Sequence, residues 1–344
     1  MFVLDFTLPQ WLIFYYHFIG TISIFLNTFG IYLLKYQCEK LGSFRYWLML
    51  YQIICFLTDL HFTFLMQPVP LYPLLAGYTV GVLWKWFRVP PMVSMIVVCD
   101  LIVAQFILLV VLFLKKHRSI APLANRCVFP KILDYIVLVI YVIAFSLLFW
   151  ADFSLPLTGE EQWDFIKKTV PEYVSGFETL DNFEIVEKKP EYIFLVSAAF
   201  IAGFIIGPLM LFVVLDILRM MRSLKSKISS VNYQRHWEAI KCLLVQIFTA
   251  CLSLAPILLL GIAVVLEFYH AQFLTECFIA WFVTHSSLNM LFLLVVFPPF
   301  KKFIVKHHKR TFEEKNQREN ICDASLVQEQ AVTGSTQISY EQPY

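Results

Sequence analysis

Residues 92–114 read MVSMIVVCDLIVAQFILLVVLFL, and the basic run KKHR follows directly at 115–118. Asp100 is the single charged side chain in this stretch of 23 residues. A helix of about 20 mostly apolar residues is long enough to cross the hydrocarbon core of a bilayer. The stretch therefore predicts a membrane-spanning helix with a basic cluster at its end.

Similar apolar stretches occur along the chain and predict seven spans. They cover residues 11–34, 47–66, 92–114, 132–151, 192–217, 242–266 and 275–297. The composition agrees, because 59% of the residues are hydrophobic and 15% are charged, whereas soluble domains have about half and about a quarter. In lipid a backbone must satisfy its own hydrogen bonds, which favours helices. The predicted fold class is an all-α membrane protein, a seven-transmembrane helix bundle.

The distribution of Lys and Arg predicts the orientation of this bundle. The connecting segments 35–46, 115–131, 218–241 and 298–344 hold 21 of the 27 Lys and Arg residues, and the segments on the other side hold 6. Basic connecting segments face the cytosol by the positive-inside rule. The N-terminus is therefore predicted outside and the C-terminus in the cytosol.

The region after the seventh span divides into two parts. Phe300, Phe303 and Ile304 share one helical face among lysines, which predicts a short interfacial helix on the inner leaflet. The remainder is polar and predicts a disordered cytoplasmic tail. The predicted domains are thus a seven-helix transmembrane domain at 1–310 and a tail at 311–344.

Five polar side chains are predicted to lie inside the bilayer. With a rise of about 1.5 Å per residue, Asp59, Asp100 and His285 lie about 18–21 Å from the inner ends of their spans. Asn27 and Asn289 lie about 10–12 Å from theirs. Such groups face the bundle interior or a wet cavity, so one interior polar cluster is predicted. Two interpretations stay open: an ion or proton site that rearranges, or hydrogen bonds that only hold the helices together.

The longest outer segment, 152–191, carries ten Asp and Glu and four Lys. Pro156, Gly159, Pro171 and Gly176 predict turns within it. Long ordered loops often serve function, and one interpretation is a cover over an outward-facing pocket. The alternative is an acidic, solvated loop without a specific role.

Several function classes find no support in the sequence. Walker, Rossmann, GxSxG and HExxH motifs are absent, and the eight His residues show no ligand spacing. The sequence therefore predicts no catalytic residue, no cofactor and no metal, and a membrane hydrolase with a buried metal is the least favoured class. The basic runs flank spans, so nucleic acid is not a predicted partner.

Several motifs carry a family resemblance. The central ones are Leu57-Thr58-Asp59-Leu60-His61 and Gln67-Pro68-Val69-Pro70-Leu71. Late in the chain, Thr284-His285-Ser286-Ser287-Leu288-Asn289 and Pro298-Pro299-Phe300-Lys301-Lys302 fit the same pattern. The chain resembles the nematode serpentine chemoreceptors of class I (Sri) in the Str superfamily, a family of seven-transmembrane G-protein-coupled receptors. The class H receptors are the nearest alternative.

The resemblance implies a chemosensory receptor that binds a small molecule from outside and activates a heterotrimeric G protein. It implies a location in the plasma membrane, in cilia of sensory neurons. In this interpretation Arg219, Arg222 and Lys225 flank the groove that receives the G protein. No individual ligand contact is predicted.

Two features depart from the rhodopsin-like pattern. The third span ends in KKHR at 115–118, without an Asp/Glu-Arg-Tyr motif. The predicted outer segments contain no cysteine pair, so no disulfide is expected between the third span and the second outer loop. Asp59 matches the intramembrane acid of the second helix, and a sodium-binding role for it is a hypothesis.

Two other classes of membrane protein remain as alternatives. A seven-helix ligand-gated channel subunit has its N-terminus in the cytosol, which the charge distribution opposes. A transporter would take up a solute in a manner that depends on Asp59 or Asp100.

Overall fold

The computed structural model describes residues 3–266, 271–301, 303, 305 and 313. The chain divides into two compact units, Met1–Phe297 and Pro298–Tyr344. In the second unit the described residues 298–301, 303 and 305 are helical, which agrees with the predicted short helix. Its place on a membrane and the domain boundary at 310 stay predictions. The predicted tail lies outside the described residues except at position 313.

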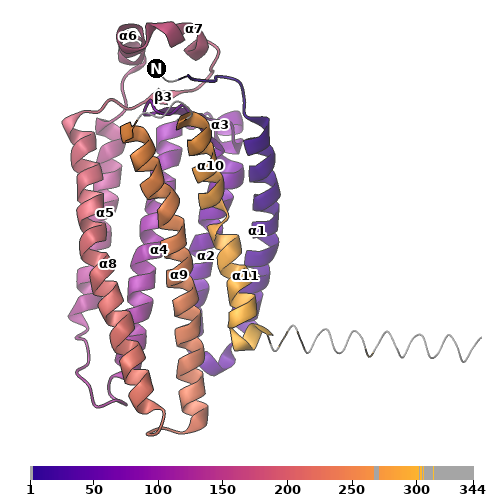
Figure 1. Cartoon of the computed structure of the whole chain (residues 1–344), viewed down its shortest axis with the longest axis vertical. Coiled ribbons are helices and arrows are strands. Elements are labelled where there is room, and N and C mark those ends of the chain that lie inside the picture. Colours follow the sequence, from indigo (N-terminus) through magenta and orange to yellow (C-terminus); the bar gives the residue numbers. More distant parts are fainter. Residues whose placement is uncertain (1–2, 267–270, 302, 304, 306–312, 314–344) are drawn as a thin grey trace, which may run out of the picture. The chain divides into compact units, whose positions relative to one another are not determined.

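Seven spans build the first unit and confirm the predicted fold class (Figure 1). They are α1 (Gln10–Tyr36), α2 (Phe44–Leu60) with the π-helical turn His61–Met66, α4 (Pro91–Ile120), α5 (Ile132–Ser154), α8 (Pro190–Leu224), α9 (Ser230–Leu266), and the pair α10 (Ala271–Val283) and α11 (His285–Val296). In the described part of the chain these are the helices long and apolar enough to cross a membrane. A short α3 (Val82–Phe87) precedes α4, and a 3-10 turn (Glu39–Leu41) joins α1 to α2.

The helices are longer than the predicted spans at the end of the bundle where the basic connecting segments 35–46, 115–131 and 218–241 lie. Helix α9 begins at Ser230 rather than at 242, and α4 continues to Ile120. Hydropathy locates the apolar part of a helix but not the turns that continue into water. The seventh span also differs, because its helix is interrupted at Thr284.

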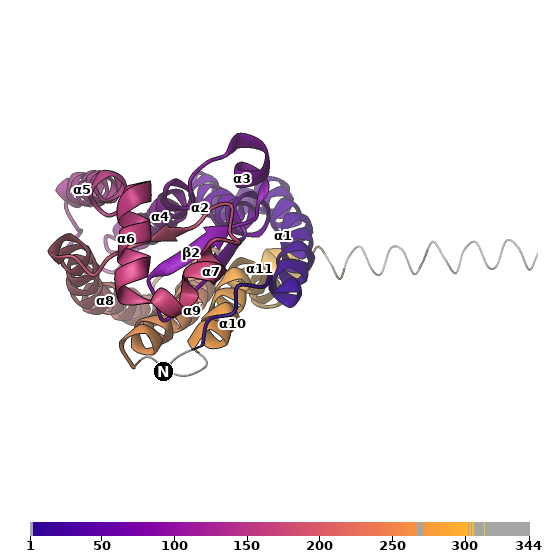
Figure 2. The same cartoon turned by 90° about the horizontal axis from the view of Figure 1, so that it is seen from above.

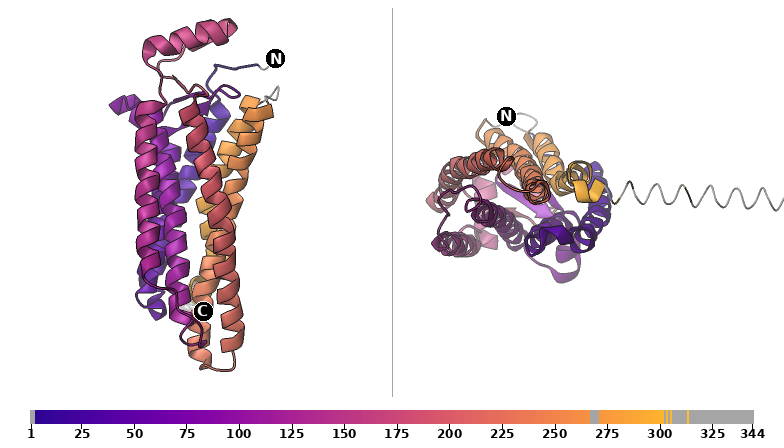
Figure 3. Two further views of the ribbon diagram at one scale, coloured as in Figure 1. Left: turned by 90° about the vertical axis from the view of Figure 1, so that its left-hand side faces the viewer. Right: turned by 90° about the horizontal axis from the view of Figure 1, so that it is seen from below.

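Helix α4 is the central element of the bundle. It packs against α2, α5, α8 and α9, and it lies among them in the end-on views (Figures 2 and 3). Helix α5, by contrast, packs on α4 and α8 and exposes large apolar side chains such as Phe145 and Phe149. Exposed apolar side chains are compatible with lipid, which solvates them at no cost.

Two glycines let α1 approach its neighbours closely. A Cβ atom at Gly30 would lie 2.4 Å from the Met290 side chain of α11, and one at Gly20 would lie 2.6 Å from Thr63 in the π-helical turn. Small residues allow such close helix contacts in membranes. The approach brings the polar face of α1 against α2 and α11.

A small antiparallel sheet follows the second span. Its strands are β1 (Pro68–Pro70), β2 (Ala76–Thr79) and β3 (Glu184–Ile185), in the order β1-β2-β3. Pro68 pairs with Thr79, and Gly77 pairs with Glu184. Proline has no N–H to donate, so a strand with two prolines belongs at a sheet edge, where β1 lies.

The segment 155–189, named the lid here, joins α5 to α8 and is folded. It contains α6 (Gly159–Thr169), a 3-10 turn (Pro171–Tyr173), α7 (Val174–Phe177) and β3. Thr158 caps α6: its backbone N–H donates to Glu161 at 2.9 Å, and its hydroxyl accepts from the Glu161 N–H at 3.4 Å. Hydrogen bonding of the Glu161 carboxyl to the backbone N–H and to the side chain of Thr158 holds its pKa below the usual value. Figure 2 shows α6 and α7 over β2 at one end of the bundle.

The lid packs on the sheet through an apolar core. Its buried members come from the hairpin and from the lid: Val69, Leu71, Ala76, Tyr78, Ile166, Val170, Phe177 and Ile185. Phe6 of the N-terminal segment adds an edge-to-face contact with Phe177, with ring centroids 5.0 Å apart. Asp5 also exchanges hydrogen bonds with Gln272 of α10, at 2.8 and 2.9 Å. The lid is thus held by strand pairing and packing.

Three of the predicted cytosolic segments, 35–46, 115–131 and 218–241, lie together at the bundle end opposite the lid (Figure 3). The structure therefore separates the basic segments from the acidic lid. Which end faces the cytosol stays a prediction of the charge distribution.

The lid core generates a testable prediction. Phe177 is fully buried, and Phe→Ala at such a site costs about 3–5 kcal/mol. Phe177→Ala should loosen the lid, so trypsin should cleave the purified protein after Lys167 and Lys168 at least about tenfold faster. Phe87→Ala, in the exposed end of α3, is the control and should leave the rate unchanged. Equal rates for the two variants would contradict this role of Phe177.

Candidate functional site

A cavity of about 440 Å³ lies between the sheet and the neighbouring helix ends. Helices α4, α5, α8, α9 and α10 contribute to its walls, together with all three strands. Its lining is dominated by apolar and sulfur-containing side chains, including Met66, Met92, Met95, Ile279 and Phe282. A pocket of this size and character is typical of a small-molecule site.

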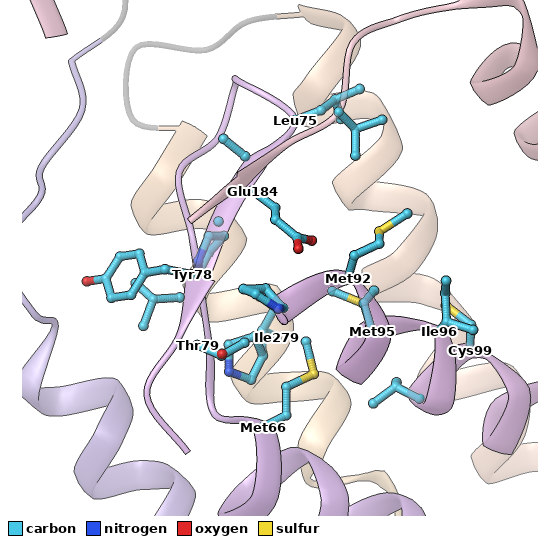
Figure 4. A pocket seen from close by; sticks show the side chains of 18 of the residues that line it. Met66, Leu75, Tyr78, Thr79, Met92, Met95, Ile96, Cys99, Glu184 and Ile279 are labelled. Carbon is cyan, nitrogen blue, oxygen red and sulfur yellow. The ribbon is translucent and has the colours of Figure 1, made fainter. Parts of the chain in front are cut away.

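Glu184 supplies the carboxylate among the described lining residues. Figure 4 shows its side chain extending from β3 into the cavity, toward the wall that Met92 and Met95 of α4 form. Its partner across the sheet is Gly77. Directly paired residues of antiparallel strands project on the same face, and Gly77 has no side chain beside Glu184 there.

Two tyrosines that line the cavity, Tyr72 and Tyr78, carry neutral phenol groups. Burial raises the pKa of Tyr78 to about 12, and the Glu276 and Asp5 carboxylates act in the same direction. Burial likewise raises the pKa of Tyr72. Neutral phenols offer hydrogen bonds without charge.

A chain of contacts connects the cavity floor to the bundle interior. Phe282 lines the cavity, and its carbonyl oxygen lies 3.0 Å from Nδ1 of His285. Nε2 of His285 lies 3.4 Å from Gln105 of α4. The Gln105 amide in turn donates to the Thr58 hydroxyl of α2 at 2.5 Å. The interruption at Thr284 places this histidine where α10 meets α11.

Asp59, next to Thr58, belongs to a polar network in the bundle core. The Ser23 hydroxyl donates to its carboxylate. The Asn27 amide donates to Ser23 at 2.7 Å and to Asp59 at 3.4 Å. The carbonyl oxygen of Asn27 accepts from Ser286 of α11 at 3.2 Å. Asn27 thus joins α1 to both α2 and α11.

The network continues toward the basic end. Gln52 of α2 donates to the Asn27 carbonyl oxygen and accepts from Asn289 at 3.3 Å. Asn289 also accepts from the Thr249 hydroxyl of α9 at 3.2 Å. These side chains are buried. The predicted residues Asn27, Asp59 and Asn289 therefore meet in one network, and His285 reaches its edge through Gln105.

Asp100 lies elsewhere. Its carboxylate accepts from the Tyr141 hydroxyl of α5, at 3.2 and 3.4 Å. It precedes Gln105 by five residues, which is about 140° around a helix of 3.6 residues per turn. Since Gln105 faces α2 and α11, Asp100 faces α5 instead. The expectation of one cluster that includes Asp100 is corrected to two separate sites.

The basic run 115–118 at the end of α4 contacts four helices. Lys115 lies over the Trp47 ring of α2, 4.1 Å from its centroid. The Lys116 ammonium donates to Nδ1 of His236 on α9 at 3.0 Å. The remaining pairs are His117 with Asp216 of α8, at 3.1 Å, and Arg118 with Asp134 of α5, at 2.5 Å.

These contacts follow from helix geometry. Successive residues point about 100° apart, so four in a row cover most of the circumference of α4. They find partners on all sides because α4 is central. The sequence did not predict that Asp134 pairs with Arg118 or that Asp216 pairs with His117. Contacts between different helices leave no pattern in the sequence that would reveal them.

Arg219, Arg222 and Lys225 lie at the same end of the bundle. All three are exposed, on the last turns of α8 and at its C-cap. They are therefore accessible to a partner, and a role in G-protein contact stays a prediction. In the part of the chain that the structure describes, no group of three or more His, Cys, Asp or Glu side chains is placed to hold a metal ion.

Comparison with known families adds an independent finding. A family model described as "Serpentine type 7TM GPCR chemoreceptor Sri" matches residues 2–304. This range contains the seven spans, the lid and the polar network. No curated protein matches the sequence.

The polar network generates a second prediction. Asn27→Ala would remove the hydrogen bonds that this amide makes with its buried neighbours and leave them unsatisfied, at a cost of about 1–3 kcal/mol. The midpoint of thermal unfolding of the detergent-purified protein should fall. Asn232→Ala changes an exposed asparagine of α9 and should leave the midpoint in place. An unchanged midpoint for Asn27→Ala would show that the network adds no stability.

Proposed function

The chain belongs to the Sri family of serpentine seven-transmembrane chemoreceptors, and we propose that it binds a small molecule in the lid-end cavity and activates a heterotrimeric G protein. The observation that carries the proposal is the family match over residues 2–304. The cavity supports it, because an apolar pocket of about 440 Å³ beside a folded lid suits a small ligand.

The protein is a multi-pass membrane protein of a receptor family. We propose that it works in the plasma membrane, in cilia of sensory neurons, with its lid outside, and that it catalyses no reaction. The basic segments at the opposite end support this orientation. The lipid bilayer, a small-molecule ligand and a G protein are then its partners.

The contacts between cavity and interior suggest how binding is transmitted. A ligand against Phe282 would act on His285, which stacks on that ring with centroids 5.2 Å apart. His285 contacts Gln105, which reaches Thr58 beside Asp59. A ligand that fits one arrangement of these side chains better than another shifts the population of bundle states. The role of the network as an ion or proton site stays a hypothesis.

At the basic end, the contacts of α4 favour a closed arrangement. His117 holds α8 through Asp216, and Lys116 holds α9 through His236. Separation of the ends of α8 and α9 from α4 would open a groove for a G-protein helix. Arg219, Arg222 and Lys225 would then flank the incoming partner.

Orientation is the first point to test. An epitope tag before Leu4 should be reached by antibody on intact cells, and a tag after the C-terminus should be reached only after permeabilisation. A tag in the lid between Glu178 and Leu180 should behave like the N-terminal one. An N-terminal tag that is reached only in permeabilised cells would contradict the receptor orientation and favour a channel subunit.

The contact between His117 of α4 and Asp216 of α8 generates a further prediction. If the pair of His117 and Asp216 stabilises the closed state by about 1–2 kcal/mol, its loss shifts the equilibrium by a factor of about five to thirty. Asp216→Ala should therefore raise ligand-independent G-protein activation several-fold at equal surface amount, measured in cells with a co-expressed G protein.

The matched control is Asp134→Ala. It breaks the Arg118 pair, which joins α4 to α5 rather than to α8. This variant should keep the low basal signal. Equal basal activation in Asp216→Ala and the unchanged protein would contradict the closing role of the His117 contact.

A further inference from the structure

Lys116 of α4 is a buried cation without an acidic partner. Its side chain is 6% exposed, and its ammonium donates to Nδ1 of His236 on α9 at 3.0 Å. The next two residues of α4, by contrast, pair with Asp216 and Asp134. In the described part of the chain, no carboxylate forms a salt bridge with Lys116. A buried charge is costly unless it is compensated, so this position favours an anion.

Arg235 adds a second cation at the same place. It precedes His236 in the first turns of α9, is exposed, and lies close enough to the Lys116 ammonium to repel it. Among the described residues it has no salt-bridge partner. Glu238, the acid that follows on α9, instead accepts a hydrogen bond from Gln234 at 3.1 Å. The two cations therefore repel each other without a neutralising acid, and one of them is open to water.

The start of α2 positions both cations. The Lys116 ammonium lies over the Phe44 ring, 5.4 Å from its centroid. A Cβ atom at Gly42 would lie 3.0 Å from the Arg235 guanidinium, so this side chain lies against the turn that precedes α2. Phe44 is the first residue of that helix, and Ser43 makes no side-chain cap hydrogen bond. The N-terminus of a helix favours an anion nearby, which adds to the effect of the two cations.

His236 offers a donor rather than an acceptor to a ligand. Its Nδ1 accepts from Lys116, so the neutral ring carries its proton on Nε2. The Lys116 ammonium has three N–H groups and uses one of them for this contact. The polar groups that Lys116, Arg235 and His236 leave for a ligand are therefore hydrogen-bond donors. Donors on cationic side chains bind the oxygen atoms of an anion strongly.

From these observations we infer that Lys116, Arg235 and His236, named the cation cluster here, bind a phosphate monoester. Such a group carries a charge of about −1.5 to −2 and three acceptor oxygens. It therefore matches two cations, whereas a carboxylate would leave one cation uncompensated. The predicted third span ends at Leu114, two residues before Lys116, so the cluster lies near the level of the lipid headgroups. A phosphorylated inositol, either free or as the headgroup of an anionic lipid, presents this chemistry there.

The first arm of the test uses inositol trisphosphate as a soluble probe and myo-inositol as its uncharged counterpart. Dissociation constants are measured with the purified full-length protein in detergent. The trisphosphate should bind at least about tenfold more tightly than myo-inositol, because hydrogen bonds to charged groups are the stronger ones. Arg235→Gln should weaken binding of the trisphosphate at least about tenfold. Because Arg235 is exposed, this variant should keep the midpoint of thermal unfolding of the ligand-free protein.

The matched control is Lys227→Gln. It removes an exposed cation of the connection between α8 and α9, outside the cation cluster, and should bind the trisphosphate as the unchanged protein does. Lys116→Gln removes the buried cation and should weaken binding like Arg235→Gln. This second variant shows whether the buried position, and not only the exposed one, contributes to the site.

The second arm distinguishes a lipid headgroup from a free phosphate. The protein is placed in nanodiscs of phosphatidylcholine, with or without phosphatidylinositol bisphosphate. A ligand that binds the folded state raises the midpoint of thermal unfolding, so the bisphosphate should raise it for the unchanged protein and for Lys227→Gln but not for Arg235→Gln. A response to the lipid alone identifies the headgroup as the source, and a response to the trisphosphate alone identifies a free phosphate. No response in either arm, or equal responses of Arg235→Gln and Lys227→Gln, would overturn the inference.

Both arms use purified protein, so the site is tested independently of G-protein coupling. Under the proposed function, an anion bound by Lys116 and Arg235 would hold α9 against α4 and oppose the opening of the groove. Phosphatidylinositol bisphosphate in the nanodisc should then lower ligand-independent G-protein activation several-fold. An anion that binds through Arg235 but leaves this activation unchanged would support the site and contradict the closing role of the contact between α4 and α9.

Discussion

Hydrocarbon offers no hydrogen-bond partner to a polar group, and this constraint organises the interior of the bundle. Asp59, Asn27 and Asn289 are tolerated at membrane depth because each has partners on other helices. The same hydrogen bonds join α1, α2, α9 and α11. Polar residues that would be costly alone therefore become the contacts that define how the helices meet.

The central position of α4 has consequences at both ends of the bundle. Near the lid, Met92 and Met95 of this helix form a wall of the cavity. At its other end, Lys116 and His117 hold α9 and α8. A displacement of α4 relative to its neighbours would thus be felt at the cavity and at the basic end together. Under the proposed function, this is a physical route by which a ligand and a G protein would influence one another.

The lid is held in place without a disulfide, since residues 155–189 contain no cysteine. Strand β3 pairs with β2, and Phe177 packs into an apolar core that includes Phe6. Strand pairing satisfies backbone groups, and the apolar core removes side chains from water. The same pairing directs Glu184 toward the cavity, so the element that secures the lid also contributes a side chain to the cavity wall.

The sequence by itself determined the number of spans and predicted the separation of basic from acidic segments, because hydropathy and charge are local properties that sum along the chain. It also singled out Asn27, Asp59, Asp100, His285 and Asn289 as interior groups. Only the tertiary structure decided which of these groups meet. The Asp100 carboxylate accepts a hydrogen bond from Tyr141 and is separate from the others, because the helix that a side chain faces is determined by residues far away in the sequence. For the same reason the cavity, the fold of the lid and the place of Glu184 emerged only with the packed structure.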